Sequence, residues 1–234
     1  MTFPDPLIPG TLIKRYKRFL ADVELESGEI VTAHCPNSGT MKTCADPGFK
    51  VMLSPANNPK RKLKYTLEMT HNGTCWIGVN TQRPNEVVYE AVVNGEIAEL
   101  AGYDSYRREV KYGKNSRIDV LAESANRPPC WIEVKNTTML ADDGCLVFPD
   151  AVTERGRKHL EELMAQVAEG DRAVMVFLCN RSDCSPFRAA REIDPKYADK
   201  LDEAIAAGVE LLTPLTEITP QGIRIVDSVP LANA

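Results

Sequence analysis

Short runs of alternating hydrophobic and polar residues occupy the first third of the chain, the pattern of half-buried β-strands. Val23 and Leu25 alternate with acidic residues, Ser27-Gly28 predicts a turn, and the alternation resumes at 30–31. Three further segments have the same character: residues 50–53, 66–70 and 76–79. Several short strands joined by Pro- and Gly-rich turns predict a small antiparallel β-barrel of the OB type over residues 1–82.

After residue 82, segments whose apolar residues have the spacing of a helix alternate with segments that have the spacing of a strand. Apolar residues recur at helical spacing over 86–93, and Asn85 stands where a helix cap belongs. A second helix carries Arg155 in its first turns and ends at Gly170. The remaining predicted elements are strands at 106–110, 117–122, 130–135, 173–178 and 209–212, a hairpin turn at 112–115 and a helix at 197–207. Together they predict an α/β domain, a mixed sheet flanked by helices, over residues 83–234.

Length and composition narrow the class of protein. A chain of 234 residues is long enough for two domains that each bury a core. No apolar run approaches the ~20 residues of a membrane span, and the first residues lack the basic and apolar regions of a signal peptide. The seven cysteines, an odd number without regular spacing, fit a reducing compartment. We therefore expect a cytoplasmic protein with no membrane partner.

The acidic net charge of −5 argues against a protein that binds polyanions over its whole surface. Any nucleic-acid site must then be a local basic patch, and two runs in the barrel mix basic with aromatic residues as OB folds do. The predicted DNA contacts there are Lys14, Arg15, Tyr16, Lys17, Arg18, Lys60, Arg61 and Lys62. The alternative for each run alone is an ordinary solvated strand or loop.

Basic residues also open the helix that follows residue 153. Arg155 and His159 lie in its first turns, where positive charge opposes the helix dipole by a few tenths of a kcal/mol. Helix N-termini bind phosphate readily. We therefore expect Arg155 and His159 to contact DNA as well.

The sequence spacing of two acidic residues, Asp119 and Glu133, and of Lys135 indicates a metal site. Glu133 and Lys135 are two residues apart in a strand and point to the same face. If the strand of Asp119 pairs with this one as a hairpin, two carboxylates and an ammonium converge. Mg²⁺ prefers such oxygen ligands, and the lysine would orient a water or stabilise phosphoryl charge. The alternative is a solvated Glu–Lys pair without function.

A zinc site is a much weaker interpretation. His34, Cys35 and Cys44 are close in sequence, but they lack the short spacing of zinc ligands and no second cluster follows. Partly buried, reduced cysteines explain them better.

The order helix, three strands, helix, strand resembles the core of PD-(D/E)xK nucleases, with Asp119 on the second strand and Glu133-x-Lys135 on the third. By this resemblance Asp119 and Glu133 hold Mg²⁺ and Lys135 assists the attacking water. Glu90 matches a helix glutamate that some branches add to the catalytic set.

Nearly the whole chain resembles the sugar fermentation stimulation protein A family. Five segments carry this resemblance: RYKRFLADV at 15–23, CPNSG at 35–39, SRID at 116–119, IEVK at 132–135 and FPDAVTERG at 148–156. The resemblance implies an OB-like domain, a nuclease-like domain, DNA binding and a regulatory role in sugar utilisation.

Two functions stay open at this stage. The first is a DNA-binding protein without sequence specificity that has a nuclease-type magnesium site. The second is an active Mg²⁺-dependent nuclease that cleaves DNA or RNA. DNA binding is common to both.

Overall fold

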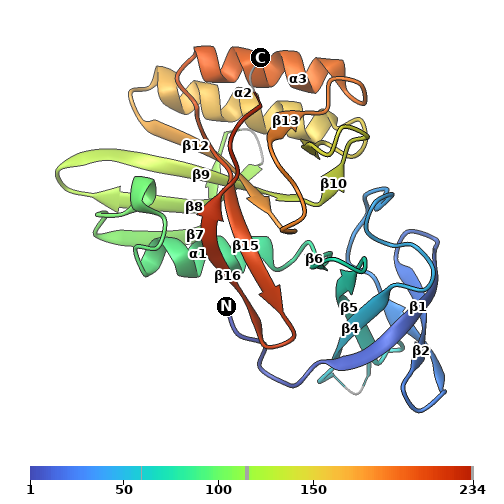
Figure 1. The fold of residues 1–234 in the computed structure, drawn as a ribbon. Helices are drawn as coiled ribbons and strands as arrows, with labels where there is room; N and C mark the ends of the chain where they lie inside the picture. Colours follow the sequence, from blue (N-terminus) through green and yellow to red (C-terminus); the bar gives the residue numbers. More distant parts are fainter. Residues whose placement is uncertain (59, 114–115, 233–234) are drawn as a thin grey trace.

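The computed structural model describes residues 1–58, 60–113 and 116–232 of the chain (Figure 1). It contains an N-terminal β-barrel and a larger α/β part, which meet along one side of the barrel. No helix among the described residues is long and apolar enough to cross a membrane.

The barrel is OB-like. Its strands are β1 (Ile8–Tyr16), β2 (Leu20–Leu25), β3 (Ile30–His34), β4 (Lys50–Pro55), β5 (Tyr65–His71) and β6 (Trp76–Gly78). They follow the order β3-β2-β1-β4-β5-β6, and a parallel contact between His34 of β3 and Thr66 of β5 closes the sheet on itself. The alternating apolar residues Leu12, Val23 and Leu53 fill its interior, as the pattern predicts.

A mixed sheet forms the centre of the α/β part. Its order is β16-β15-β12-β9-β8-β7, with β14 beside β12. These strands are β7 (Ser105–Tyr112), β8 (Ser116–Ser124), β9 (Arg127–Thr137), β12 (Arg172–Cys179), β14 (Glu210–Leu212), β15 (Pro214–Thr219) and β16 (Gly222–Ser228). A small second sheet contains β10 (Met139–Leu140), β11 (Leu146–Phe148) and β13 (Phe187–Ala189).

Helices cover both faces of the mixed sheet. The helix α1 (Pro84–Val93), followed by a 3₁₀ turn at Ala98–Leu100, packs on the face that carries Ile132 and Val134 of β9. The helices α2 (Glu154–Ala168) and α3 (Pro195–Ala206) pack on the opposite face. Because side chains alternate along β9, Glu133 and Lys135 point to the α2 side, as their spacing predicts.

The structure differs from the sequence predictions at three places. Arg83, not Asn85, is the N-cap of α1, and no side chain caps that helix end. The hairpin of β15 and β16 is not predicted, although Ile223 and Ile225 alternate with Arg224 in β16. Residues 1–3 were predicted to belong to the barrel, but Thr2 bridges to Gly222 and so extends the sheet of the α/β part at its edge strand. The predicted turn at 112–115 includes residues 114–115, which lie outside the described residues.

A buried arginine joins the two parts of the molecule. Arg181 is 2 % exposed and donates through Nε and Nη2 to the Asp183 carboxylate, at 2.6 and 2.8 Å. Its Nη1 donates to the carbonyls of Thr43 in the barrel and Thr138 in the α/β part, at 3.1 and 2.8 Å. Arg181 therefore connects both parts through one rigid side chain.

Hydrogen bonds also fix the segment between the barrel and helix α1, which contains Asn80 and Arg83. The carboxylate of Glu68 on β5 is buried and accepts two hydrogen bonds from Arg83, at 2.9 and 2.8 Å, and one from Asn80 at 2.8 Å. Bidentate contacts of this kind fix the position of both partners. The chain between β6 and α1 is therefore held against β5 at Asn80 and Arg83.

Replacing Arg181 tests the importance of this connection. Arg181→Met removes the buried guanidinium and leaves the Asp183 carboxylate, 15 % exposed, with the Asn72 amide as a donor at 2.6 Å. We therefore expect a cost of about 3 kcal/mol, the lower end of the range for broken buried pairs. We expect the midpoint of thermal unfolding to fall by about 6 °C or more, measured by calorimetry. Arg224→Met is the matched control, because the Arg224–Glu217 pair is 69 % and 48 % exposed and should contribute little. Equal midpoints for both variants would contradict the account.

Candidate active site

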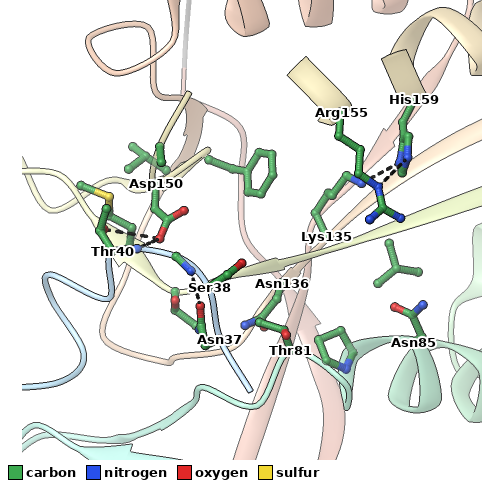
Figure 2. A pocket seen from close by; sticks show the side chains of 18 of the residues that line it. Asn37, Ser38, Thr40, Thr81, Asn85, Lys135, Asn136, Asp150, Arg155 and His159 are labelled. Atoms are coloured by element: carbon green, nitrogen blue, oxygen red, sulfur yellow. Dashed lines mark hydrogen bonds between the residues drawn. The ribbon is translucent and has the colours of Figure 1, made fainter. Parts of the chain in front are cut away.

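A pocket of about 790 Å³ lies between the barrel and the α/β part (Figure 2). The barrel contributes Arg15, Arg18 and the loop at 37–40. The α/β part contributes residues from β8, β9, the loop after β11 and the first turns of α2, including Asp119, Glu133, Lys135, Arg155 and His159. The structure therefore brings the predicted acid–acid–lysine set into one cavity, together with four of the predicted DNA contacts.

Asp119 lies where the strands β8 and β9 separate. The last paired residues of this antiparallel ladder are Val120 and Ile132. Beyond this pair the Val134 N–H donates to the Asp119 carboxylate at 2.7 Å, in place of a backbone carbonyl of β8. Its other oxygen accepts from the Asn85 side-chain amide at 2.6 Å. Two uncharged donors thus fix Asp119 at the edge of the pocket.

Glu133 is the most deeply placed carboxylate of the site, with 2 % of the residue exposed. Its Oε1 accepts from Lys135 Nζ at 2.6 Å and contacts His159 Nδ1. Its Oε2 is buried and has no hydrogen-bond partner within the described part of the chain. A buried carboxylate oxygen without a donor is costly, so this atom is suited to bind a cation.

His159 and Arg155 complete the arrangement from helix α2. Arg155 Nε lies 3.3 Å from His159 Nε2, and Lys135 Nζ lies 3.1 Å from His159 Nδ1 (Figure 2). His159 is 5 % exposed. The sequence predicts it as a DNA contact; in the structure it lines the pocket, is almost fully buried, and its contacts are with protein side chains.

The two carboxylates have opposite pKa shifts. Burial, and then the charge of Glu133, raises the pKa of Asp119 to about 7. Burial also acts to raise the pKa of Glu133, but the Lys135 ammonium and the contacts with His159 outweigh it, and the pKa is lowered. Glu133 is therefore ionised at neutral pH, whereas Asp119 holds its charge only when something compensates it.

The oxygen donors fit a hard divalent cation. Among the described residues no three His, Cys, Asp or Glu side chains group into a metal site. Two carboxylates are nevertheless enough for Mg²⁺, which keeps several of its waters in proteins. The partnerless Oε2 of Glu133 and the uncompensated charge at Asp119 both favour such an ion between them.

A loop of the barrel forms the opposite wall of the pocket. Arg15 donates to the carbonyls of Asn37, Gly39 and Thr40 at 2.8, 2.9 and 3.3 Å, so it shapes this loop instead of presenting its charge to solvent. The Thr40 N–H donates to Asp150 Oδ2 at 2.6 Å (Figure 2). A Cβ on Gly39 would lie 2.1 Å from the same oxygen, so only glycine permits this approach.

Arg18 reaches the pocket from the turn between β1 and β2. Lys17 and Arg18 both have positive φ, 48° and 62°, in this turn. Residues other than glycine rarely adopt this conformation, which costs ~1–2 kcal/mol per residue. Such strained positions are common at functional sites. The turn leaves Arg18 exposed at the pocket wall.

Other predicted residues lie elsewhere. Lys14 and Tyr16 contact Asp22 on the outer face of the barrel, at 3.6 and 3.0 Å. Arg61 donates to Thr66 at 3.3 Å. Within the described residues, the pocket lining does not include Lys17, Lys60, Arg61 or Lys62.

Glu90 is also outside this pocket. Its Oε2 forms an ion pair with the amino group of Met1 at 2.8 Å. The helical period places Glu90 beside the apolar face of α1, which packs with Met1 and Phe3 on the face of the sheet opposite α2. The structure therefore does not bring Glu90 together with Asp119 and Glu133.

Sequence reasoning missed Asn85, Thr40 and Asp150 as site residues. The signal for the last two was present, since the segments CPNSG and FPDAVTERG border or contain them and were noted without a role. Asn85 was assigned to a helix cap, and only the tertiary structure shows its contact with Asp119. Cys35 and Cys44, which the sequence interprets as reduced core cysteines in preference to zinc ligands, are buried in the barrel core.

Comparison with known proteins gives matches over almost the whole chain. Residues 13–79 match the family described as "SfsA N-terminal OB domain", and residues 82–222 match "Sugar fermentation stimulation protein RE domain". A "Sugar fermentation stimulation protein homolog" of Geobacter sulfurreducens is 52 % identical over 99 % of this chain and 98 % of its own. A homolog of the same description from Paramagnetospirillum magneticum is 55 % identical over 96 % of this chain and 95 % of its own.

A solved structure has the same fold. It is described as "The structure of Pyrococcus Furiosus SfsA in complex with Ca2+" and superposes with a TM-score of 0.87, covering 100 % of this chain and 98 % of the other. Its sequence identity is 24 %, so the likeness concerns the fold.

The raised pKa of Asp119 predicts how stability depends on pH without metal. The folded-state pKa of about 7 lies above the ordinary value of 3.8. The protonated Asp119 carboxyl therefore makes its full contribution to the free energy of unfolding below pH ~4, and this contribution is lost as the pH rises through ~7. Asp119→Asn has no carboxyl group that can ionise, so the variant does not lose this contribution. In EDTA we expect the variant to unfold at least about 2 °C above the wild type at pH 8, the shift that corresponds to about 1 kcal/mol.

The same comparison at low pH is the control. Near pH 4 the advantage of Asp119→Asn should shrink, because the wild-type carboxyl is then protonated in the folded protein. An advantage that does not change between pH 4 and pH 8 would contradict the assignment of the charge penalty to Asp119.

Proposed function

Because the chain belongs to the sugar fermentation stimulation protein family, we propose that it binds DNA and hydrolyses phosphodiester bonds in the pocket between its two parts with a divalent cation. The observation that carries this proposal is the buried, partnerless Oε2 of Glu133 next to Asp119 and Lys135 in a pocket with basic walls. DNA binding and cleavage are separate claims, and each has its own test below.

Asp119 and Glu133 would hold Mg²⁺. When bound, the ion polarises the phosphoryl group and stabilises the charge that develops on it. Calcium appears in the description of the Pyrococcus furiosus structure with this fold, and a hard cation of the same class is what we propose for this chain. Asn85 and the Val134 N–H keep Asp119 in place, and Lys135 and His159 do the same for Glu133.

Lys135 has two tasks in this proposal. Its ammonium neutralises Glu133 at 2.6 Å, which keeps a carboxylate ionised in a buried place. The same group faces the pocket, where it would orient an attacking water or stabilise the phosphoryl oxygens. A lysine at this position therefore serves both the metal ligand and the reaction.

Phosphates of the nucleic acid would meet basic groups on two walls. Arg18 comes from the barrel and Arg155 from the first turn of α2, whose backbone N–H groups favour anions. Arg155 keeps donors free beyond its Nε contact with His159, since a guanidinium has five. This combination makes the barrel part of the substrate site and not only a separate binding module.

A second candidate is a DNA-binding protein that does not cleave. The contact of Lys135 with Glu133 favours it, because an ammonium held by a carboxylate is less available to a water molecule. Both candidates predict DNA binding, so the presence of cleavage separates them.

Cleavage is tested on single-stranded, duplex and branched DNA and on RNA, with Mg²⁺ or Mn²⁺ and with EDTA. We expect cation-dependent cleavage of at least one of these. Asp119→Ala, Glu133→Gln and Lys135→Ala should each reduce its rate by ~10²-fold or more, since each removes a group that acts on the developing charge. DNA affinity should remain, because phosphate contacts come from other residues.

Glu90→Gln is the matched control for these variants. Glu90 pairs with the Met1 amino group outside the pocket, so its variant should cleave at the wild-type rate. If Glu90→Gln lost as much rate as Glu133→Gln, Glu90 would have the catalytic role that the PD-(D/E)xK resemblance implies, and its assignment outside the site would be wrong. Absence of cleavage on every substrate would favour the binding protein.

The basic walls are tested by the salt dependence of DNA binding. The slope of log Kobs against log salt falls by ~0.7–0.9 for each phosphate contact removed. We expect Arg18→Gln to reduce the slope by about this amount, while Lys62→Gln, on a loop outside the pocket lining, should leave it unchanged. Fluorescence anisotropy with a labelled oligonucleotide measures both. A larger effect at Lys62 would place the DNA on the other side of the barrel.

A further inference from the structure

His159 contacts the most buried acid of the pocket and lies at the junction of three charged side chains. We infer that His159 is a positioning residue, which fixes the Glu133 carboxylate so that its Oε2 points to the cation, and that Arg155 selects the histidine tautomer that does this. The inference rests on the proposed function, since it concerns the same metal site.

The tautomer follows from the donors around the ring. A guanidinium group only donates hydrogen bonds, so the 3.3 Å contact from Arg155 Nε requires His159 Nε2 to accept. Lys135 Nζ, 3.1 Å from Nδ1, likewise only donates, and its proton goes to Glu133 Oε1 at 2.6 Å and not to the ring. The ring proton is then on Nδ1. That N–H faces Glu133 Oε1 and donates to it. Arg155 thereby determines which ring nitrogen points its proton toward the acid.

The two donors to Glu133 converge on one of its oxygens. Oε1 accepts from His159 Nδ1 and from Lys135 Nζ, while Oε2 has no partner among the described residues. A carboxylate held in this way cannot rotate without breaking both contacts. Oε2 is therefore left as the oxygen available to a metal ion, and its direction is set before the ion arrives.

The histidine itself has a rigid base. The first turn of α2 is capped by Thr153, whose Oγ1 accepts from the Gly156 N–H at 2.9 Å. The buried Asp194 carboxylate accepts from the Thr153 N–H at 2.8 Å and from Arg157 at 3.0 Å. A Cβ on Gly156 would lie 2.9 Å from the Tyr197 ring, so this turn also packs closely against α3. His159, one turn further on, has little freedom to move.

Partners of this kind contribute to metal affinity without touching the metal. Removing a group that orients a metal ligand typically costs 10–100-fold in affinity. Lys135 alone does not replace the histidine, because its flexible side chain and point charge do not define the orientation of the carboxylate plane. We therefore expect the Mg²⁺ affinity of the pocket to depend on the Nδ1 donor of His159.

A pair of variants separates the two ring nitrogens. His159→Asn retains an N–H donor at the position of Nδ1, whereas His159→Gln carries its amide at the position of Nε2 and keeps no donor toward Glu133. We expect His159→Gln to weaken Mg²⁺ or Mn²⁺ binding ~10–100-fold and His159→Asn to stay close to the wild type, measured by isothermal titration calorimetry on the full chain. Thermal unfolding in EDTA checks that both variants are folded.

Two results would overturn the inference alone, provided that the wild-type protein binds the cation. One is equal binding by His159→Gln and the wild type, and the other is an equal loss in both variants. A wild-type protein that binds neither Mg²⁺ nor Mn²⁺ would overturn the proposed function and this inference with it. Because binding is measured without substrate, the outcome does not depend on whether the protein cleaves DNA.

Nitrogen NMR of the wild-type protein provides a second measurement that needs no variant. The chain has three histidines, so the ring signals of His159 can be assigned with few spectra. We expect Nδ1 to carry the ring proton that faces Glu133, with Nε2 in the unprotonated range. A ring of His159 that is protonated on Nε2 would contradict the role assigned to Arg155 and to the Glu133 contact.

Discussion

A carboxylate removed from water has to be surrounded by donors, and this constraint on Glu133 determines how the pocket is built. Lys135 on the same strand and His159 on α2 satisfy one of its oxygens, so the other stays free. The strand alternation of β9 places the first partner, and the rigid start of α2 places the second. Asp119 can then lie nearby only with its own pKa raised, unless a cation compensates both acids. The local energetics of the site therefore favour a bound divalent ion.

The pocket exists because two structural units are fixed against each other. Asp150 holds Thr40 of the barrel loop, and Arg181 connects Thr43 with Thr138 through a buried side chain. The Glu68 carboxylate holds Arg83 just before α1, the helix that supplies Asn85. These contacts make the barrel one wall of the site. A barrel joined by a free linker would have no such role, and Arg18 would not face the acidic residues.

Much of the fold follows from local patterns in the sequence, and the site follows only in part. Alternation places Glu133 and Lys135 on one face, and a hairpin brings Asp119 beside them. Contacts between residues far apart carry no such pattern: Asn85 and Asp119 are 34 positions apart, and Thr40 and Asp150 are 110 apart. Glu90 has a suitable helical position, but the first residues of the chain lack periodicity, so the sequence does not show that the Met1 amino group pairs with it. His159 belongs to a basic run, and its burial depends on packing that no local pattern encodes.

The central claim is that Glu133 and Asp119 together hold a divalent cation through the oxygen that the protein leaves without a partner. Crystals grown with Mn²⁺, measured near the manganese absorption edge, test it most directly through the anomalous signal of the ion. The account predicts a peak in this pocket about 2.1 Å from Glu133 Oε2, with Asp119 as a second ligand and Glu133 Oε1 still bound by His159. A pocket without a peak, or an ion bound through Oε1 with His159 displaced, would contradict it.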